Sequence, residues 1–358
     1  MTIQPRAELA AIRAYVPGKP APDVPGALKL ASNENPLGPS PRALEAIAAA
    51  LPGLHRYPDP GSAALKAALS ERHGLALDHF LVGNGSDDVI HLLASAYLEP
   101  GRLVVLADPP YSIHRIAAQL RGATLALVPV RDHVHDLDAM ARVARPGGWV
   151  AVTNPHNPTG TTVEPDALRR FVDAVPDDCL ILLDEAYFDF VEDGLRCTGA
   201  SIVQDHPNLV VLRTFSKAYG LAGIRVGYAI ANPAVLEPVE RVRPPFNVGV
   251  LGQAAAVAAL ADREHLERTV SSNATARRLF LEACARMGLE AIPSQTNFVL
   301  VANQDARGRG GWPEALHAAG ISVRPGENLG MRGWHRVTMG TLEDMQRVAR
   351  IMEGALTE

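Results

Sequence analysis

Residues Thr214 to Tyr228, TFSKAYGLAGIRVGY, carry most of the information about the fold and chemistry of this chain. They follow directly on the strand-like run LVVLR. In open α/β sheets, ligands bind at the carboxyl ends of strands, so Ser216 and Lys217 are expected to point into a crevice together with Thr214. Arg225, eight residues after Lys217, has a planar guanidinium that suits a phosphate. A lysine alone in a glycine-containing turn is usually a surface residue, so its neighbours decide its role.

Short apolar runs bounded by turn residues recur along the chain. They are His79 to Val82, Leu103 to Ala107, Thr124 to Val130, Trp149 to Thr153, Leu180 to Leu183, Leu209 to Leu212 and Arg225 to Ile230. Runs that are apolar on both faces are typical of buried, mostly parallel strands. Helical patterns lie between them at Asp87 to Leu98, Ser112 to Leu120, Pro165 to Ala174 and Pro233 to Val242. This alternation predicts an α/β fold with a mostly parallel sheet flanked by helices.

The pattern changes near Asp262 to one long helical stretch through Met287, three further strand-like runs and a final helix. The strand-like runs are Asn297 to Val301, Ile321 to Val323 and His335 to Met339. We therefore predict a large α/β domain of residues 36–261 and a smaller α+β domain of residues 262–358. Residues 1–35 contain five prolines, Pro5, Pro17, Pro20, Pro22 and Pro25, which predicts an extended N-terminal arm without regular structure. Such an arm often packs on a partner subunit.

Composition excludes several classes of protein. The formal net charge of -5 provides no basic field for nucleic acid or anionic lipid. Three widely spaced cysteines, Cys179, Cys197 and Cys284, argue against a disulfide framework and fit a reducing cytoplasm. The first residues lack a signal-peptide core, and no run approaches the roughly 18 apolar residues of a membrane span. We expect a soluble, cytoplasmic protein whose partners are small molecules.

A second polar motif is LILLDEAY, residues 180–187, where an apolar strand ends in two carboxylates. Burying Asp184 there requires a partner, and the protonated nitrogen of a pyridine ring is one candidate. A helix N-cap or a magnesium site remains an alternative for this motif alone. The chain contains no GxxxxGK[ST] motif, which argues against a nucleotide triphosphatase.

Two further turns follow predicted strands. In TNPHNPTG, residues 153–160, the amide of Asn157 can donate to a phenolate oxygen, although turn chemistry also explains these residue types. GNGSDD, residues 83–88, begins a helix whose amides near Ser86 and Asp87 can hold a phosphate. Because Asp88 replaces the third glycine of GxGxxG, the motif does not indicate a dinucleotide site, and a simple capped helix start remains possible.

Single aromatic and basic residues complete the candidates. Tyr111 follows a predicted strand and can stack on a flat heterocycle, whereas Tyr57 lies in a proline-rich loop. Either tyrosine alone is more often a packing residue. Arg324 and Arg336 lie in predicted strands of the smaller domain and suit a carboxylate or phosphate. His133 and His135 lack further ligands, so we predict a solvated loop there and no metal site.

Taken together, TFSKAYGLAGIRVGY, DEAYFDF, TNPHNPTG and ASNENPLGPSP resemble pyridoxal-phosphate-dependent class II aminotransferases of fold type I. More narrowly, AYVPGKP, NENPLG, RYPDP and VRPG before RVTMGT resemble the histidinol-phosphate aminotransferase family. The similarity extends from about residue 10 to the C-terminus. It implies the fold type I architecture, with a seven-stranded, mostly parallel sheet, and pyridoxal 5'-phosphate as cofactor.

The resemblance assigns a role to each motif. Lys217 would hold the cofactor as a Schiff base and act as general base, while Asp184 would pair with the pyridine nitrogen. Tyr111 would stack on the ring. The other implied cofactor contacts are Asn157 and Tyr187 at the phenolate oxygen, Thr214, Ser216, Arg225 and the amides near Ser86 and Asp87 at the phosphate, and Tyr57 from the other subunit of a homodimer.

The same resemblance implies a reaction between a small-molecule amino donor and a keto acid. L-Histidinol phosphate and 2-oxoglutarate would give 3-(imidazol-4-yl)-2-oxopropyl phosphate and L-glutamate, a step of L-histidine biosynthesis. Arg336 would hold the anionic group of either substrate, Arg324 would be a second anion contact, and Asn33 would line the site.

Departures from the family pattern keep alternatives open. VANQDARGRGGW, residues 301–312, stands where relatives more often continue into a helix, His335 stands where an aliphatic residue is commoner, and Leu37 where some relatives have tyrosine. An aromatic amino-acid aminotransferase or a threonine-phosphate decarboxylase would use the same scaffold and also retain Lys217. A non-catalytic regulator that binds the cofactor would carry a DNA-binding extension before the aminotransferase part.

Overall fold

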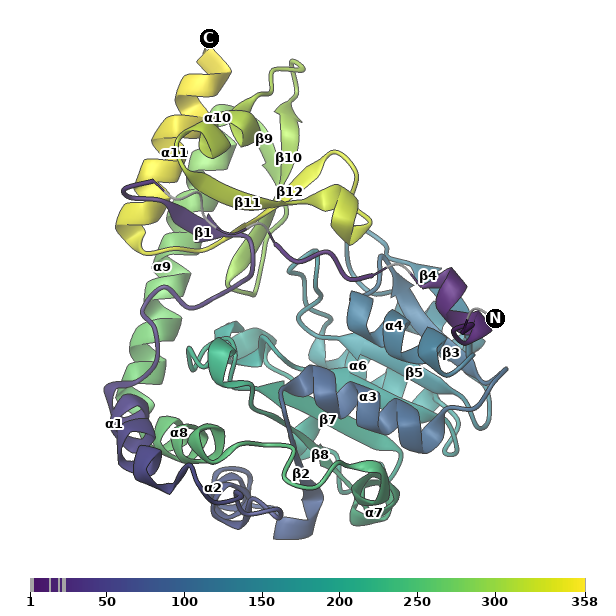
Figure 1. The fold of residues 1–358 in the computed structure, drawn as a ribbon. Coiled ribbons are helices and arrows are strands. Elements are labelled where there is room, and N and C mark those ends of the chain that lie inside the picture. Colours follow the sequence, from purple (N-terminus) through teal and green to yellow (C-terminus); the bar gives the residue numbers. More distant parts are fainter. Residues whose placement is uncertain (1–2, 13, 19, 21–23, 358) are drawn as a thin grey trace.

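Seven strands form the larger of two sheets (Figure 1). The computed structural model describes residues 3–12, 14–18, 20 and 24–357. In spatial order the strands are β2 (Phe80–Gly83), β8 (Gly227–Ala231), β7 (Leu209–Thr214), β6 (Leu180–Asp184), β5 (Trp149–Thr153), β3 (Leu103–Asp108) and β4 (Thr124–Pro129). Only β8 runs antiparallel to its neighbours in this sheet, which confirms the prediction of a mostly parallel sheet.

The register of the central strands brings three polar motifs to one edge of the sheet. Thr153 of β5 pairs with Asp184 of β6, and Asp184 pairs with Leu212 of β7. The carboxyl ends of these strands therefore lie side by side.

Strand β4 differs from the prediction that each strand is buried on both faces. It lies at the edge of the sheet, and Leu127 is 43% exposed.

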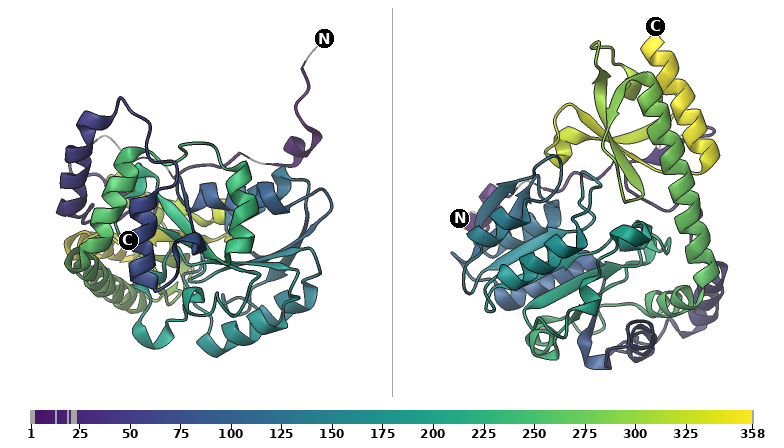
Figure 2. Two further views of the ribbon diagram at one scale, coloured as in Figure 1. Left: turned by 90° about the horizontal axis from the view of Figure 1, so that it is seen from below. Right: turned by 180° about the vertical axis from the view of Figure 1, so that it is seen from behind.

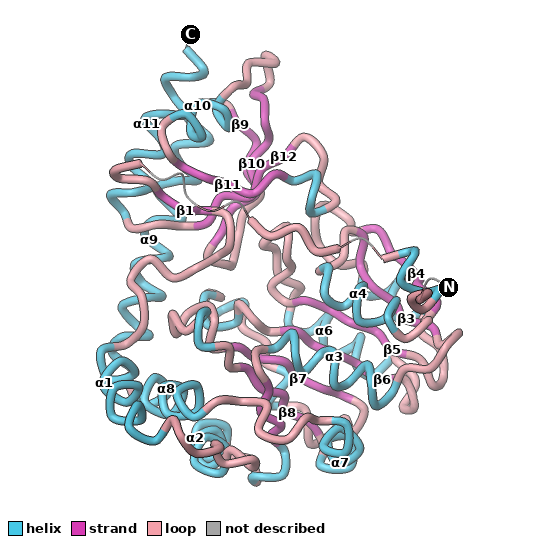
Figure 3. Tube along the Cα trace, in the orientation of Figure 1, coloured by secondary structure: helices cyan, strands magenta, loops and turns pink. Residues whose placement is uncertain are grey.

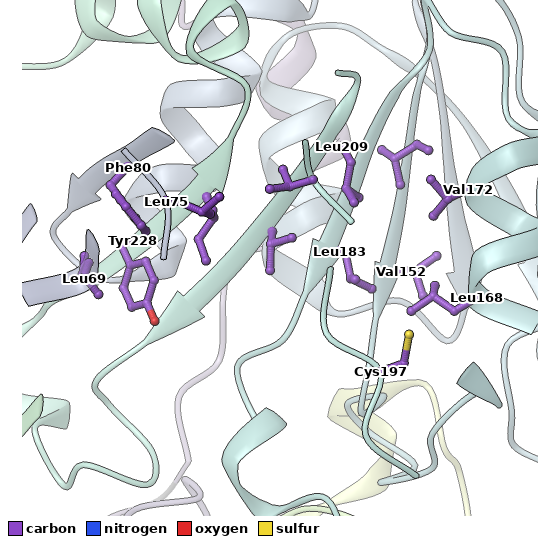
Figure 4. Close-up of a cluster of buried hydrophobic side chains, with 14 of the residues drawn as sticks. Leu69, Leu75, Phe80, Val152, Leu168, Val172, Leu183, Cys197, Leu209 and Tyr228 are labelled. Carbon is purple, nitrogen blue, oxygen red and sulfur yellow. The ribbon is translucent and has the colours of Figure 1, made fainter. Parts of the chain in front are cut away.

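Alternate residues of the central strands face two different helical layers. In β5, Val150 and Val152 belong to one buried cluster, drawn in part in Figure 4, whereas Trp149 and Ala151 belong to the other. The first cluster is covered by α1 (Pro41–Ala50), α2 (Ala63–His73), α5 (Leu137–Val143), α6 (Pro165–Ala174) and α8 (Val250–Ala261). The second is covered by α3 (Ser86–Tyr97), α4 (Ser112–Leu120) and α7 (Pro233–Val242). Burial on both faces explains why the strands are almost continuously apolar.

A second, five-stranded sheet lies beyond the carboxyl edge of the large sheet (Figures 1 and 2). Its order is β1 (Leu28–Leu30), β11 (Ile321–Pro325), β12 (Trp334–Thr338), β10 (Phe298–Asp305) and β9 (Leu289–Ala291). The accompanying helices are α9 (Arg263–Met287), α10 (Trp312–Ala318) and α11 (Leu342–Thr357). They pack on this sheet around a third buried cluster that includes Phe280, Trp312 and Met352.

The N-terminal arm crosses from one sheet to the other, and Figure 3 shows most of it as loop. Its beginning forms a 3-10 helix, Ala7–Ala11, near α4, where Arg6 donates to the carbonyl of Leu120. Its end is β1, which pairs in parallel with β11. The prediction that the arm has no regular structure is therefore wrong at these two places, because the small sheet offers β1 an unpaired edge. Pro22, one of the five prolines behind that prediction, lies outside the described residues.

Candidate active site

A cavity of about 320 Å³ opens at the carboxyl ends of β5, β6 and β7. Ten of the eleven predicted cofactor residues line it: Ser86, Asp87, Tyr111, Asn157, Asp184, Tyr187, Thr214, Ser216, Lys217 and Arg225. These residues are spread over 140 positions of sequence, from 86 to 225. The parallel arrangement of the strands, with the turns that follow them, brings them together.

The amine of Lys217 is weakly held. Its Nζ atom lies 3.5 Å from the carbonyl oxygen of Ser32, at the limit of a hydrogen bond, and 5.7 Å from the centroid of the Tyr187 ring. In the described part of the chain it forms no ion pair. The amine is thus free to react with a carbonyl group placed in the cavity.

Asp184 is buried at the end of β6 with both carboxylate oxygens engaged. Oδ1 accepts from the amide of Ala186 at 3.1 Å, and Oδ2 lies 3.2 Å from Nε2 of His114. We did not predict a role for His114. Its signal in the sequence is that it lies one helical turn after Tyr111 at the start of α4, so that both side chains are directed toward the same strand ends.

On the other side of the cavity, cationic and hydroxyl groups gather around the start of α3. Arg225 donates to Oγ of Ser216 at 3.3 Å and lies 3.6 Å from Oδ2 of Asp87. The hydroxyl of Tyr111 donates to Oδ1 of Asp87 at 3.0 Å. Burial, reinforced by the Asp87 charge, raises the pKa of Tyr111 well above its ordinary value, so the phenol stays protonated and remains a donor.

The geometry around Gly85 fits an anion such as a phosphate. Gly85 precedes the first residue of α3, offers no side-chain cap and has φ +93°, so amides of the first helical turn are left to other acceptors. A Cβ atom here would lie 2.7 Å from Nη2 of Arg225. Only glycine therefore allows the guanidinium to lie directly against the helix start.

Arg336 and Asn33 connect this cavity to the small sheet. Arg336 donates from Nη1 to Oδ1 of Asn157 at 2.8 Å and from Nη2 to the carbonyl of Ala31 at 3.1 Å. Asn33 donates from Nδ2 to the hydroxyl of Tyr187 at 2.7 Å. Burial is the main cause that lowers the pKa of Arg336. Asn157 and Tyr187, which line the first cavity, are therefore held by Arg336 of β12 and by Asn33, which follows β1.

Arg324, Arg336 and Asn33 line an adjoining cavity of about 440 Å³, which shares Lys217 and Tyr187 with the first. Arg324 is buried, donates to the carbonyl oxygen of Val16 and lies 5.7 Å from the Tyr15 ring. The structure thus places Arg324 at the predicted location, but its guanidinium already contacts the arm.

Tyr57 is the predicted cofactor residue that lies away from the cavity. It is 81% exposed and stacks on Phe246, with 4.5 Å between the ring centroids. Both rings belong to loops on the outer surface. Contact between Tyr57 and a cofactor would require a second copy of the chain.

The prediction of a solvated loop around His133 and His135 is wrong for His135. This side chain is buried, and Nε2 lies 2.9 Å from the carbonyl of Thr153, so it packs behind the end of β5.

The described residues contain no group of three or more side chains suited to a metal ion. Among the described helices, none is long and apolar enough to cross a membrane.

Comparison with known proteins places these residues in a family. The sequence profile of "Aminotransferase class I and II" matches residues 25–352. The chain belongs to this family. The predicted resemblance to class II aminotransferases is thus confirmed, and the fold is that of the fold type I members.

Three of the similar proteins are histidinol-phosphate aminotransferases. The chain is 44% identical to histidinol-phosphate aminotransferase 2 of Ralstonia nicotianae, over 97% of this chain and 96% of that protein. It is 43% identical to histidinol-phosphate aminotransferase 1 of Cupriavidus pinatubonensis, over 97% and 95% of the two chains. The crystal structure of histidinol-phosphate aminotransferase from Sinorhizobium meliloti in complex with pyridoxal-5'-phosphate superposes with a TM-score of 0.84, at 30% identity over 92% and 91%.

Proposed function

We propose that this chain is a pyridoxal-phosphate-dependent histidinol-phosphate aminotransferase of L-histidine biosynthesis. It transfers the amino group between L-histidinol phosphate and 2-oxoglutarate, giving 3-(imidazol-4-yl)-2-oxopropyl phosphate and L-glutamate. The observation that carries the proposal is the convergence of Lys217, Asp184 and Arg225 on one cavity. An amine, a buried carboxylate and a guanidinium match the aldehyde, ring nitrogen and phosphate of one cofactor. The 41 to 44% identity to three histidinol-phosphate aminotransferases supports the choice of substrate.

The residues present fit the cofactor at both ends. Asp184 is held by Ala186 and His114, so its carboxylate is oriented before a ring nitrogen arrives and favours the protonated nitrogen. Arg225, Ser216 and the start of α3 offer charge and donors to a phosphate. When bound, pyridoxal 5'-phosphate delocalises the negative charge that develops on the substrate carbon.

The chain supplies proton transfer and orientation. Lys217 would hold the cofactor through its Nζ atom, and the same atom, when it is free, can take the proton from the carbon that bears the substrate amine. Arg336 holds the anionic group next to that carbon and, through Oδ1 of Asn157, aligns it with the ring-binding residues. Asn157, Tyr187 and Tyr111 line the cavity, where the first two would donate to the phenolate oxygen and Tyr111 would contact the ring.

We also propose a homodimer with shared active sites. Tyr57 is exposed at a distance from its own cavity, and Leu44, Leu51 and Leu54 form an exposed apolar surface on and after α1. Exposed apolar patches of this kind mark subunit interfaces.

We also propose that the protein is cytoplasmic. The three cysteines are free and buried, which supports a reducing cytoplasm as the location.

A substrate panel tests the proposed function. Purified holoenzyme is supplied with 2-oxoglutarate and one amino donor at a time: histidinol phosphate, phenylalanine, tyrosine or threonine phosphate. We expect glutamate to form with histidinol phosphate at least about 100-fold more efficiently, in kcat/KM, than with the aromatic amino acids. A preference for an aromatic amino acid, or release of carbon dioxide from threonine phosphate, would replace the assignment.

A further inference from the structure

Two arginine Nε atoms in the described part of the chain are buried without a hydrogen-bond partner, those of Arg115 and Arg336. Both arginines line the same cavity of about 440 Å³. A buried donor without a partner is costly unless a ligand satisfies it. The unpaired Nε atoms of these two guanidinium groups therefore mark two positions for anions within one cavity.

Helix geometry explains why Arg115 faces the cavity. One face of α4 carries Ser112, Arg115 and Gln119, three residues at helical spacing that line this cavity. The opposite face, with His114 and Ala118, is buried against the large sheet. Because the buried face fixes the rotation of α4, the direction of Arg115 is fixed as well.

Arg115 and Arg324 differ in their availability. Within residues 3–12, 14–18, 20 and 24–357, Arg115 has neither a hydrogen bond nor an ion pair. Arg324 already donates to Val16 and lies against the Tyr15 ring. A second anion in this cavity therefore finds an unpaired donor at Arg115 rather than at Arg324.

The two anion positions differ in their relation to the first cavity. Arg336 bonds to Asn157, which lines both cavities, so its anion lies next to Lys217. Arg115 lines only the cavity of about 440 Å³, on the wall formed by α4. An extended ligand that reaches both positions needs one anionic group near its amine and another at its far end.

We propose that Arg115 binds the distal carboxylate of the dicarboxylate substrate, glutamate or 2-oxoglutarate, whose other carboxylate binds Arg336. This inference rests on the proposed function. Histidinol phosphate has one anionic group, and the far end of the molecule is an imidazole without negative charge. The guanidinium of Arg115 therefore has a carboxylate to bind in glutamate or 2-oxoglutarate, but no anionic group to bind at the imidazole end of histidinol phosphate. Arg115 is thus a specificity residue for one half of the reaction.

Half-reactions of the holoenzyme test the proposal. Single-turnover absorbance of the bound cofactor is recorded with L-glutamate and, separately, with L-histidinol phosphate. For Arg115→Gln we expect the apparent affinity for glutamate to fall about 10- to 100-fold, the loss of one hydrogen-bonded charge pair, with the maximum rate little changed. The constants for histidinol phosphate should change less than about threefold.

Two further variants complete the test. Arg115→Lys keeps the charge but loses the planar fork, so it should recover part of the glutamate affinity. Arg170→Gln, on the exposed face of α6, removes a charge far from the cavity and should behave as wild type. Equal losses for both substrates, a loss for histidinol phosphate alone, or unchanged glutamate affinity would each overturn the proposal.

A binding measurement without turnover gives an independent readout. Glutarate and pentanoate have the same chain length, but glutarate has the second carboxylate. We expect wild-type holoenzyme to bind glutarate at least about tenfold more tightly than pentanoate, and Arg115→Gln to reduce this ratio below about threefold. An unchanged ratio contradicts the proposal. If wild type reacts with glutamate but not with histidinol phosphate, the proposed function fails, whereas the role of Arg115 is still decided by the glutamate and glutarate results.

Discussion

The Nε2 atom of His114 lies 3.2 Å from the Oδ2 atom of Asp184, and both side chains are buried. The imidazole makes edge contacts with the rings of Tyr111 and Trp149, with centroid distances of 5.8 and 6.5 Å. These contacts hold the imidazole in place, so it can in turn fix the carboxylate of Asp184. His114 does not line the cavity itself but bonds to Asp184 and packs against Tyr111, so its role is to position these two residues.

Replacing His114 tests this positioning role. His114→Phe preserves the packing of the ring but removes the donor to Asp184, and we expect kcat to fall about tenfold because a hydrogen bond to a charged group is lost. His114→Asn, which retains a donor, should lose less. The pH titration of the bound cofactor's absorbance should shift in His114→Phe only. Wild-type kcat and titration in His114→Phe would rule out the role.

Lys217 is expected to be indispensable. Lys217→Arg keeps the positive charge but cannot attach the cofactor or accept a proton near neutral pH, so turnover should fall by at least about 10²- to 10⁴-fold. Borohydride treatment of wild type should attach the cofactor to Lys217, which peptide mass spectrometry detects. Full turnover in Lys217→Arg would refute the proposed chemistry.

Shared active sites lead to a complementation experiment. Chains with Lys217→Ala and chains with Tyr57→Ala are each expected to be defective, the second more mildly. In hybrid dimers one of the two sites receives both native residues, so random mixing should restore about one quarter of the sites. The measurement is activity after unfolding and refolding the mixture together. Activity that merely equals the average of the separate variants would show that Tyr57 serves its own chain or none.

His135 predicts a pH dependence of stability. Burial lowers its pKa to about 4, from 6.5 for an accessible histidine. The unfolded chain therefore binds a proton first as the pH falls, and the free energy of unfolding decreases between about pH 6.5 and 4. This side chain accounts for about 3 kcal/mol of that decrease.

The His135→Gln variant isolates this contribution. Its amide can still donate to the carbonyl of Thr153, but it does not titrate. Urea unfolding at several pH values should show a shallower loss of stability on acidification than in wild type, while the difference at pH 7.5 measures the packing cost alone. Parallel pH curves for the two proteins would contradict the assignment.

A buried ion pair lies behind the site, on the residues next to Asp184 and Thr214. Arg213 donates to Glu185 at 2.6 to 2.7 Å, and Glu185 accepts from the amide of Gly199 at 2.7 Å. Arg213→Met leaves the Glu185 carboxylate buried without a counter-ion and should destabilise the fold by about 3 to 5 kcal/mol.

The double variant Glu185→Gln with Arg213→Met provides the control. The neutral amide can keep a bond to Gly199, so the double variant should be more stable than Arg213→Met alone in thermal unfolding. A double variant that is less stable than Arg213→Met would indicate that Glu185 is stabilised by other contacts.

Much of the architecture could be predicted because burial leaves a local trace. The predicted strand Trp149 to Thr153 and the predicted helices Ser112 to Leu120 and Pro165 to Ala174 have the observed bounds. Strands buried on both faces must be apolar at consecutive positions, and helices buried on one face repeat every three to four residues. These patterns are properties of short segments.

Contacts between distant segments left no such trace. The pairing of β1 with β11, the burial of His135 behind Thr153 and the contact of Arg324 with Val16 all depend on how separately formed elements pack. A polar residue is compatible with solvent or with a buried partner, and the local sequence does not distinguish these cases.

The sequence by itself determined the seven strands of the large sheet, the helices α3, α4, α6 and α7, the family, and the residue types gathered around Lys217. These features are visible in the sequence because the polar residues of the site directly follow apolar runs that can be recognised as strands. The tertiary structure alone decided which of these groups are free to bind a ligand. Arg115 is unpaired and Arg324 is engaged because α4 and the N-terminal arm pack where they do, and hydrogen-bond partners depend on that packing rather than on neighbours in the chain.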